Sequence, residues 1–196
     1  MIQRKGNLDR KTKETDIKIA LNLDGGGKAE IKTGVGFLDH MLELFAVHSG
    51  FDLSISCAGD TIVDGHHSVE DIGITMGKLF NKLIGDKKGI ARYSSKTIPM
   101  DEALAMAAVD VSGRPFLAFN PGNMKGKAGE FDTELVDEFL RAFCTYGMVT
   151  AHVIVMDGRN NHHMAEAVFK AFARALSKAV KIVSDKVPSS KGMLEG

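Results

Sequence analysis

The sequence predicts an internally duplicated fold in which strands and helices follow one another in a similar order in both halves. The first observation is a repeated motif, because His-His-x-x-Glu occurs from His66 to Glu70 and again from His162 to Glu166. The second is that apolar residues after each motif recur at helical spacing, so each motif opens a helix. The third is that segments with strand-like alternation precede both motifs. A doubled motif in a doubled context indicates a duplicated unit.

The first half is predicted to run strand, strand, helix, strand, helix. Residues 15–23 alternate polar and apolar side chains, and Asp-Gly-Gly-Gly at 24–27 turns the chain back into a short strand at 28–32, which predicts a hairpin. Residues 37–48 carry an apolar stripe at helical spacing that ends at Ser49-Gly50. Residues 51–57 alternate again as a strand, and the first histidine helix follows.

The second half repeats this order from Arg92 onward. Its expected elements are extended segments at about 92–98, 102–111 and 114–119, a loop rich in proline, glycine and lysine at 121–129, a helix from Thr133 to about Phe143, a strand at 149–156 and the second histidine helix. We therefore expect a first repeat at 1–90, a second at 91–187 and a C-terminal tail at 188–196.

Length and composition favour small-molecule chemistry in a soluble protein. The chain has 196 residues with 25 basic and 25 acidic side chains, so no net field argues for nucleic acid or membrane. Its two cysteines, Cys57 and Cys144, lie in apolar surroundings and suggest reduced core residues of a cytosolic protein. No apolar signal core or transmembrane-length run is present. We expect a cytoplasmic protein.

The two histidine motifs predict a pair of metal sites. On a helix, His66 and Glu70 share a face, whereas His67 is turned about 100° from His66 and tends to serve another partner. A single histidine pair is typical of a solvent-facing or hydrogen-bonded pair. Recurrence of the whole pattern, glutamate included, favours metal binding.

Alignment of the halves on their motifs adds His40 on the first helix and, within a two-residue shift, Glu138 on its counterpart. Pseudo-symmetry then gives one metal ion with His66, Glu70, Glu138 and His163, and another with His40, His67, His162 and Glu166. Mixed imidazole and carboxylate donors suit Mn²⁺, with Fe²⁺, Co²⁺ or Zn²⁺ as possible substitutes. Ligands on opposite faces of one chain would be completed by a neighbouring subunit, which predicts a metal-linked homo-oligomer.

Basic residues elsewhere suit a phosphate group. Arg114 sits in a Ser-Gly-Arg-Pro turn where a guanidinium can clamp phosphate, and Arg92 adjoins the same predicted strands. The alternative for each is a solvated surface arginine. The Pro-Ser-Ser-Lys-Gly sequence at 188–192 has a phosphate-cradling composition, but by itself it is also that of a flexible tail. Glu14 could instead be only a charged surface residue. The spacing of His48 in the sequence favours a packing or surface histidine.

Several of these motifs together resemble one enzyme family. Gly-Phe-Leu-Asp-His-Met at 36–41, Asp-Gly-His-His-Ser-Val-Glu-Asp at 64–71, Ser-Gly-Arg-Pro at 112–115, Asn-His-His with Glu166, and the tail motif at 188–192 resemble imidazoleglycerol-phosphate dehydratase of histidine biosynthesis. The match covers almost the whole chain in order, and no phosphatase segment precedes it, so the chain resembles the monofunctional form.

The resemblance implies an α+β fold of the ribosomal protein S5 domain 2-like type. Each half is then a mainly antiparallel four-stranded sheet with two helices on one face. It also implies a 24-subunit assembly of octahedral symmetry with two Mn²⁺ per active site, formed between subunits. The expected reaction is the dehydration of D-erythro-imidazoleglycerol phosphate to imidazoleacetol phosphate through a metal-stabilised imidazolate.

Carried over residue by residue, the eight ligands are those that pseudo-symmetry gave. Many members of the family carry histidine where this chain has Glu138, and a carboxylate there would favour a hard ion such as Mn²⁺. The catalytic residues would be Glu14, as the proton-transfer group, with Glu70 and Glu166 acting mainly as ligands. The residues expected to contact substrate are Glu14, His40, His48, His66, Glu70, Arg92, Arg114, His162, Lys170, Ser189, Ser190 and Lys191.

Two rival classes remain open on the residues alone. A dinuclear metallohydrolase could use the same ligands to activate water and would release inorganic phosphate instead of a ketone. A non-catalytic assembly stapled by metal would bind the ion and oligomerise without turnover, but it leaves Arg114 and the tail motif unexplained.

Overall fold

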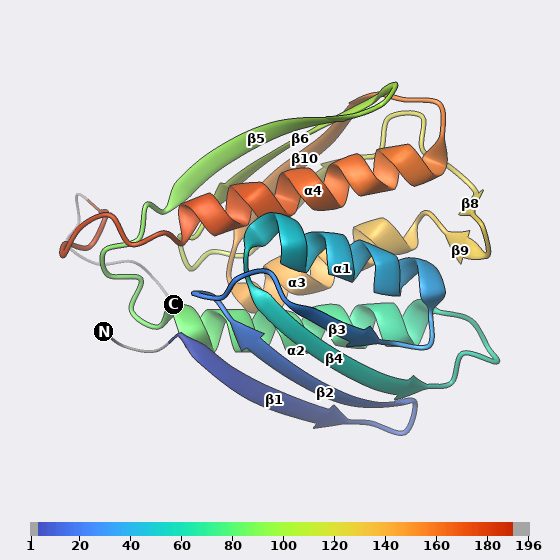
Figure 1. The fold of residues 1–196 in the computed structure, drawn as a ribbon, viewed down its shortest axis with the longest axis horizontal. Coiled ribbons are helices and arrows are strands. Elements are labelled where there is room, and N and C mark those ends of the chain that lie inside the picture. Colours follow the sequence, from blue (N-terminus) through green and yellow to red (C-terminus); the bar gives the residue numbers. More distant parts are fainter. Residues whose placement is uncertain (1–3, 190–196) are drawn as a thin grey trace.

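The computed structural model describes residues 4–189 and has four long helices between two four-stranded sheets (Figure 1). The sheets form the outer layers, and the helices cover their inner faces. This is the duplicated α+β fold predicted from the sequence. None of the helices in the described range is long and apolar enough to cross a membrane.

The first half contains one sheet with strand order β1-β2-β4-β3. Its inward face is apolar because strand residues alternate, so that Ile17, Ile19 and Leu21 of the second strand all point into the core. Its elements are β1 (Lys5–Lys11), β2 (Thr15–Asn22), β3 (Ala29–Lys32), α1 (Gly36–Ser49), β4 (Asp52–Gly59) and α2 (His66–Ile84).

The second half repeats the arrangement in the order β5-β6-β10-β7. Its elements are β5 (Tyr93–Met100), β6 (Ala103–Asp110), β7 (Phe116–Asn120), the short pair β8 (Lys127–Ala128) and β9 (Phe131–Asp132), α3 (Leu135–Gly147), β10 (Thr150–Asp157) and α4 (Asn161–Ala179). The β8-β9 hairpin lies partly in the predicted loop at 121–129. α3 begins two residues after the predicted Thr133, whose hydroxyl donates to the Gly126 carbonyl.

The two sheets share the same pattern of strand directions. Pairing is antiparallel throughout except at one edge, where β3 runs parallel to β4 and β7 runs parallel to β10. Parallel neighbours need a long crossover, and α1 and α3 supply it in the two halves. The mainly antiparallel sheets implied by the family resemblance are confirmed.

The predicted hairpin between residues 15–23 and 28–32 is wrong. β2 pairs with β1 and β4, and β4 separates it from β3. The glycine-rich turn instead wraps around Asp52, whose carboxylate accepts the backbone N–H groups of Gly26 at 2.8 Å and Lys28 at 3.1 Å. A Cβ on Gly25 would lie 2.4 Å from the Asp52 side chain, so glycine permits this close passage. The turn thus carries the chain past β4 to its far side.

The strand missed in the first half is β1, which forms the true hairpin with β2. Its sequence, Lys-Gly-Asn-Leu-Asp-Arg-Lys, has one large apolar residue, Leu8. β1 is an edge strand, and charged side chains on an edge discourage pairing with other chains, so apolar alternation gives no signal there.

The helices of the two halves pack across each other. α1 of the first half lies against α4 of the second, and α3 of the second half lies against α2 of the first. The α2–α3 contact is close because Gly73 and Gly77 face α3: a Cβ on Gly77 would lie 2.6 Å from the Phe143 carbonyl oxygen. The core is therefore shared between the repeats. The proposed repeat boundaries, 1–90 and 91–187, stay a prediction.

Candidate active site

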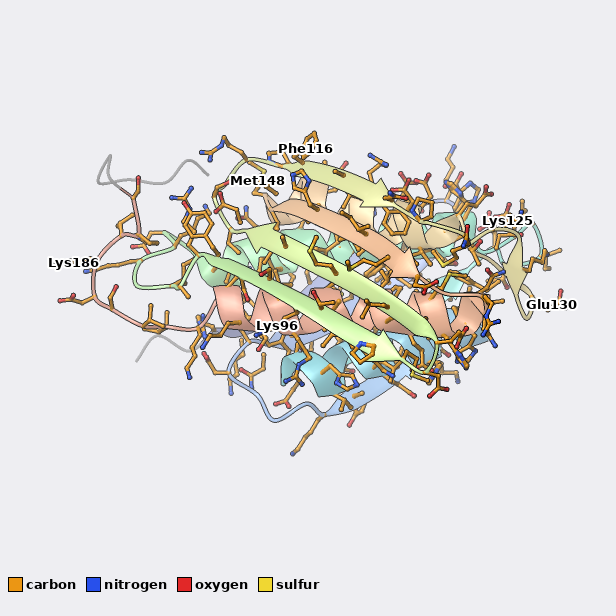
Figure 2. The ribbon with its side chains drawn as sticks, turned by 90° about the horizontal axis from the view of Figure 1, so that it is seen from above. Lys96, Phe116, Lys125, Glu130, Met148 and Lys186 are labelled. Carbon is orange, nitrogen blue, oxygen red and sulfur yellow. The ribbon has the colours of Figure 1, made fainter. Side chains whose placement is uncertain are left out.

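All four helices begin at the same end of the molecule (Figure 1). In Figure 2, Lys125 and Glu130 of the β8-β9 region mark this end and Lys186 marks the other. The predicted metal ligands all lie in the first turns of the helices, so the topology gathers them at one end. We call this the histidine end.

Two predicted histidine ligands converge on a third predicted ligand, the Glu166 carboxylate, at the histidine end. His162 Nε2 lies 3.0 Å from Glu166 Oε1, and His40 Nε2 lies 3.2 Å from the same oxygen. One donor atom from each of the three residues lies within 4.8 Å of the others, a spacing that can hold a metal ion. His40 comes from α1 and the other two from α4, so the crossed packing of the repeats builds this cluster.

Glu166 is the buried centre of the cluster, with 6% of its surface exposed. Burial raises the pKa of Glu166, but hydrogen bonds from Lys170 and His40 outweigh burial and hold the pKa at about 2. Lys170, one turn further along α4, donates to Oε2 while the histidines meet Oε1. Lys170 Nζ also lies 3.3 Å from Met100 Sδ. A predicted substrate-contacting lysine therefore adjoins the candidate metal site.

His48 lies toward the other end of α1, on the side that faces α4. Burial lowers the pKa of His48, and the nearby cations Lys170 and Arg174 lower it further. The structure thus places His48 near Lys170, whereas its spacing in the sequence indicated a packing or surface residue.

The second histidine of each motif contacts a carboxylate outside the cluster. The two rings are nearly perpendicular, at 90° for His66 and His67 and 85° for His162 and His163. His163 Nδ1 donates to Glu102 Oε2 at 2.7 Å. This hydrogen bond raises the pKa of His163 and lowers the pKa of Glu102 to about 2.

His67 makes the matching contact in the first half. Its Nδ1 lies 2.9 Å from Asp60 Oδ2, and this hydrogen bond raises the pKa of His67. Its Nε2 lies 3.9 Å from Glu14 Oε1, which extends from the turn between β1 and β2. The candidate proton-transfer residue therefore sits beside a predicted metal ligand.

The other predicted metal set is not assembled within one chain. Among residues 4–189, only His40, His162 and Glu166 bring three such donors together. His66 and Glu70 on α2 and Glu138 on α3 are half-buried on helices that pack against each other, the counterparts of α4 and α1. Their fourth predicted partner, His163, lies on α4. The half-buried side chains remain accessible at the histidine end.

The two predicted phosphate-binding arginines lie at the opposite end of the molecule. Arg92 is 9% exposed, and its guanidinium donates to Asp110 Oδ1 at 2.8 Å and to the Pro188 carbonyl at 2.9 Å. Arg114 Nη2 lies 4.0 Å from Asp110 Oδ2, so both arginines converge on one aspartate. Ser189 follows directly in the chain, while Ser190 and Lys191 lie outside the described residues. We call this the arginine end.

The length of α4 separates the two ends. The Arg92 backbone N–H donates to the carbonyl of Ala179, the last residue of α4, at 2.7 Å. A helix rises about 1.5 Å per residue, so the stretch from His162 to Ala179 spans about 25 Å. Of the predicted phosphate contacts in the described range, Lys170 lies at the middle of α4, one turn beyond Glu166 of the cluster.

Several residues at the histidine end escaped the sequence reasoning. Asp60 and Glu102 were missed because carboxylates in turns are common, although a metal-binding histidine usually has a hydrogen-bond partner on its other nitrogen. Phe37 packs edge-on against His162, with ring centroids 5.2 Å apart, and lies 4.9 Å from Phe131 of β9. The β8-β9 hairpin thus covers the side of the cluster.

Comparison with known proteins gives a consistent family. The family model for imidazoleglycerol-phosphate dehydratase matches residues 33–176. The chain is 52% identical over 194 residues to the dehydratase of Caldicellulosiruptor saccharolyticus, covering 99% of this chain and 100% of that one. It is 54% identical over 187 residues to that of Clostridioides difficile, covering 95% and 97%.

Solved structures of dehydratases from this family are also similar to this chain. The dehydratase of Staphylococcus aureus matches with a TM-score of 0.80 and 46% identity, covering 91% of this chain and 99% of that one. The Pyrococcus furiosus enzyme, in complex with (S)-C348, matches with a TM-score of 0.84 and 37% identity, covering 95% and 100%.

Proposed function

The chain belongs to the imidazoleglycerol-phosphate dehydratase family, a hydro-lyase family of histidine biosynthesis, and from this we propose a manganese-dependent reaction at sites shared between subunits. The substrate is imidazoleglycerol phosphate, and the proposed product is imidazoleacetol phosphate. The observation that carries the metal proposal is the convergence of His40 and His162 on Glu166 at the histidine end.

The donor set fits manganese. Two imidazole nitrogens and a carboxylate form the observed cluster, and carboxylates Glu70 and Glu138 belong to the second predicted set. Nitrogen and oxygen donors without sulfur suit Mn²⁺, and an additional carboxylate in place of histidine favours a hard ion. Burial raises the pKa of the Cys144 thiol to about 12, so it does not compete as a thiolate ligand. We propose two Mn²⁺ ions per active site.

The distance between the two ends supports the proposal that each site is shared between subunits. The arginine end lies about 25 Å from the histidine end along α4, which is much longer than a small phosphorylated triol with an imidazole ring. Lys170 would serve the phosphate within the same chain, and we propose that Arg92 and Arg114 come from a neighbour. His67 and His163 also contact carboxylates outside the cluster of their own chain. We propose a homo-24-mer whose contacts bring the two ends together, in the cytoplasm.

The chemistry explains why such a site needs cations. The proton to be removed lies on a carbon with no neighbouring carbonyl, so the imidazole ring of the substrate has to take up the charge. When bound, two metal ions would stabilise the imidazolate form of that ring.

The side chains of this protein do the remaining work. We assign Glu14 the transfer of the C–H proton, because its carboxylate lies beside His67 on an accessible turn. The substrate hydroxyl on the adjoining carbon leaves as water, and the resulting enol becomes the ketone. Lys170, Arg92, Arg114 and the tail residues Ser189, Ser190 and Lys191 would hold the phosphate and so orient the reacting carbons.

The test is an assay of the chelator-stripped protein with imidazoleglycerol phosphate, with and without added Mn²⁺, that follows the ketone and free phosphate together. Ketone formation that depends on Mn²⁺ and releases no phosphate supports the proposal. Phosphate release would instead establish the metallohydrolase. Bound metal without either product would overturn catalysis on this substrate and favour a metal-stapled assembly.

A further inference from the structure

The second histidines of the two motifs make the same contact with carboxylates of unrelated origin. His163 Nδ1 lies 2.7 Å from Glu102, which belongs to the turn between β5 and β6. His67 Nδ1 lies 2.9 Å from Asp60, which directly follows β4. In both halves Nδ1 of the second histidine therefore contacts a carboxylate, although the carboxylate comes from a different turn in each half.

We propose that Asp60 and Glu102 are positioning residues that hold Nε2 of His67 and His163 ready to bind metal. The inference rests on the proposed two-metal function and names the groups that orient two of the eight predicted ligands, His67 and His163. Neither residue is among the predicted ligands or substrate contacts.

The hydrogen-bonding capacity of the groups carries the argument. A charged carboxylate only accepts hydrogen bonds, and a neutral imidazole has one N–H. A carboxylate at Nδ1 therefore places the N–H there and leaves the lone pair on Nε2, which is the atom a metal ion needs. The carboxylate also raises the basicity of the ring and fixes its orientation.

The anchoring of Glu102 shows that its carboxylate is itself held in place. Its Oε1 accepts the backbone N–H groups of Asn160 at 2.8 Å and Arg159 at 3.3 Å, which leaves Oε2 for His163. A purely structural role, pinning the β5-β6 turn to the start of α4, accounts for the contacts of Oε1. It does not account for the contact of Oε2, nor for the equivalent contact that Asp60 makes in the other half.

The surroundings of Nε2 differ from those of Nδ1. Asp101 lies 3.8 Å from His163 Nε2, and Glu14 lies 3.9 Å from His67 Nε2, both beyond hydrogen-bond distance. Each second histidine thus has one nitrogen fixed by a close acid and the other directed toward a more distant acid.

The decisive variants are Glu102→Gln and Asp60→Asn, singly and combined. In Glu102→Gln, the amide oxygen can still accept the two backbone N–H groups, so the amide nitrogen turns toward Nδ1. Because an amide NH₂ donates, it favours the tautomer with hydrogen on Nε2, which cannot bind metal. Glu130→Gln is the matched control, because it removes one charge from an exposed position at the same end of the molecule.

The readout is the dissociation constant of Mn²⁺, measured by electron paramagnetic resonance of the free ion, together with the melting temperature of the metal-free protein. Each single variant should weaken one of the two sites by about 10- to 100-fold, and the double variant should weaken both. The metal-free melting temperature should stay close to that of the unmodified protein, and Glu130→Gln should leave both quantities unchanged.

Three results would overturn the inference in distinguishable ways. Unchanged Mn²⁺ affinity in both single variants would remove the positioning role. A lower metal-free melting temperature with unchanged affinity would assign Glu102 to the turn alone. An unmodified protein that binds no Mn²⁺ would overturn the two-metal proposal as well, whereas binding of two Mn²⁺ without ketone formation would overturn only the catalytic proposal.

Discussion

Glu14, an accessible side chain on the β1-β2 turn, is the proposed proton-transfer residue. We expect Glu14→Gln to abolish ketone formation while Mn²⁺ content and assembly stay intact, because the amide keeps the shape of the carboxylate but takes up no proton. The rate of single turnover and the metal content of the same sample measure this. Glu43→Gln, which removes an exposed acid from α1, is the control. A Glu14→Gln enzyme with nearly unchanged kcat would exclude this role.

Arg114 is exposed whereas Arg92 is buried, so a substitution of Arg114 can test phosphate binding with little effect on stability. The Arg114 side chain is 54% exposed, whereas Arg92 is buried between Asp110 and the Pro188 carbonyl. Loss of a charge-assisted phosphate contact costs about 1.5–3 kcal/mol, so Arg114→Ala should raise KM by about 10- to 100-fold at little cost in stability. Arg141→Ala, which removes an exposed arginine paired with Asp137 at 2.7 Å, should leave KM unchanged. An unchanged KM in Arg114→Ala would remove Arg114 from the phosphate site.

Site residues that belong to a repeated motif can be predicted from the sequence, whereas site residues outside a repeat cannot. His66 and His162 stand out because each opens the same five-residue motif. Asp60 and Glu102 serve equivalent histidines but occupy different turns, so no spacing rule connects them. The exposure of Arg114 and the burial of Arg92 depend on where Asp110 lies at the end of β6, which the sequence does not state.

At the scale of elements, the approach of α2 to α3 depends on two glycines one turn apart. A Cβ on Gly77 would lie 2.6 Å from the Phe143 carbonyl oxygen and 2.8 Å from the Gly147 backbone nitrogen, and backbone atoms cannot move aside as side chains do. Overpacking of this kind costs about 1–3 kcal/mol. It should outweigh the gain of up to about 1 kcal/mol in helix propensity when glycine becomes alanine.

We therefore expect Gly77→Ala to lower the urea midpoint of the metal-free protein, measured at fixed protein concentration. Gly26→Ala is the control, because a Cβ on Gly26 would meet nothing within 4 Å. A midpoint for Gly77→Ala equal to or above that of the unmodified chain would mean that the helices can separate at no cost.

Most elements were predictable from the sequence because their apolar periodicity is strong. α1, α2, α4 and the inner strands match expectation to within a few residues. The failures have physical causes: β1 is an edge strand with a single large apolar residue, and the glycine turn after β2 passes Asp52 instead of closing a hairpin. Periodicity reports which face of a segment is buried, but it does not report which strand becomes its neighbour.

At the scale of the whole molecule, the separation of the histidine and arginine ends makes a prediction about mixed assemblies. Neither His162→Ala nor Arg114→Ala alone should have normal activity. When the two variants are co-assembled, some sites should combine an intact histidine end with an intact arginine end, and activity at substrate concentrations below the KM of Arg114→Ala should exceed that of either variant alone. The measurement is the specific activity of the co-expressed pair relative to each variant alone.

The matched control uses two lesions in the same cluster. His40 and His162 meet Glu166 of their own chain, so co-assembly of His40→Ala with His162→Ala leaves every such cluster damaged and should restore nothing. Recovery in this control as well would mean that the chains exchange these ligands. Failure of both mixtures would indicate that one chain completes its own site.

The sequence predicts the duplication at this scale, but not how the duplicated parts interlock. The two motifs imply two similar units, and the structure has them. The pseudo-symmetric ligand sets group His40 with His162 and Glu138 with His66, but they leave open whether α1 meets α4 and α3 meets α2 within one chain or between subunits. That crossing, together with the position of Arg92 at the far end of α4, locates the ends of the proposed site.

The crossed packing of α1 on α4 and of α3 on α2 also has a consequence for the evolution of the two repeats. A single repeat would expose the helix faces that the other repeat covers, so it would need a second copy of itself. Joining two copies in one gene makes that association independent of concentration. It also frees each copy to mutate alone. Ile74 and Lys170 occupy equivalent positions, each four residues after the motif glutamate of its own half. Lys170 places a cation beside Glu166, whereas Ile74 places none beside Glu70, so the two copies have diverged at this position.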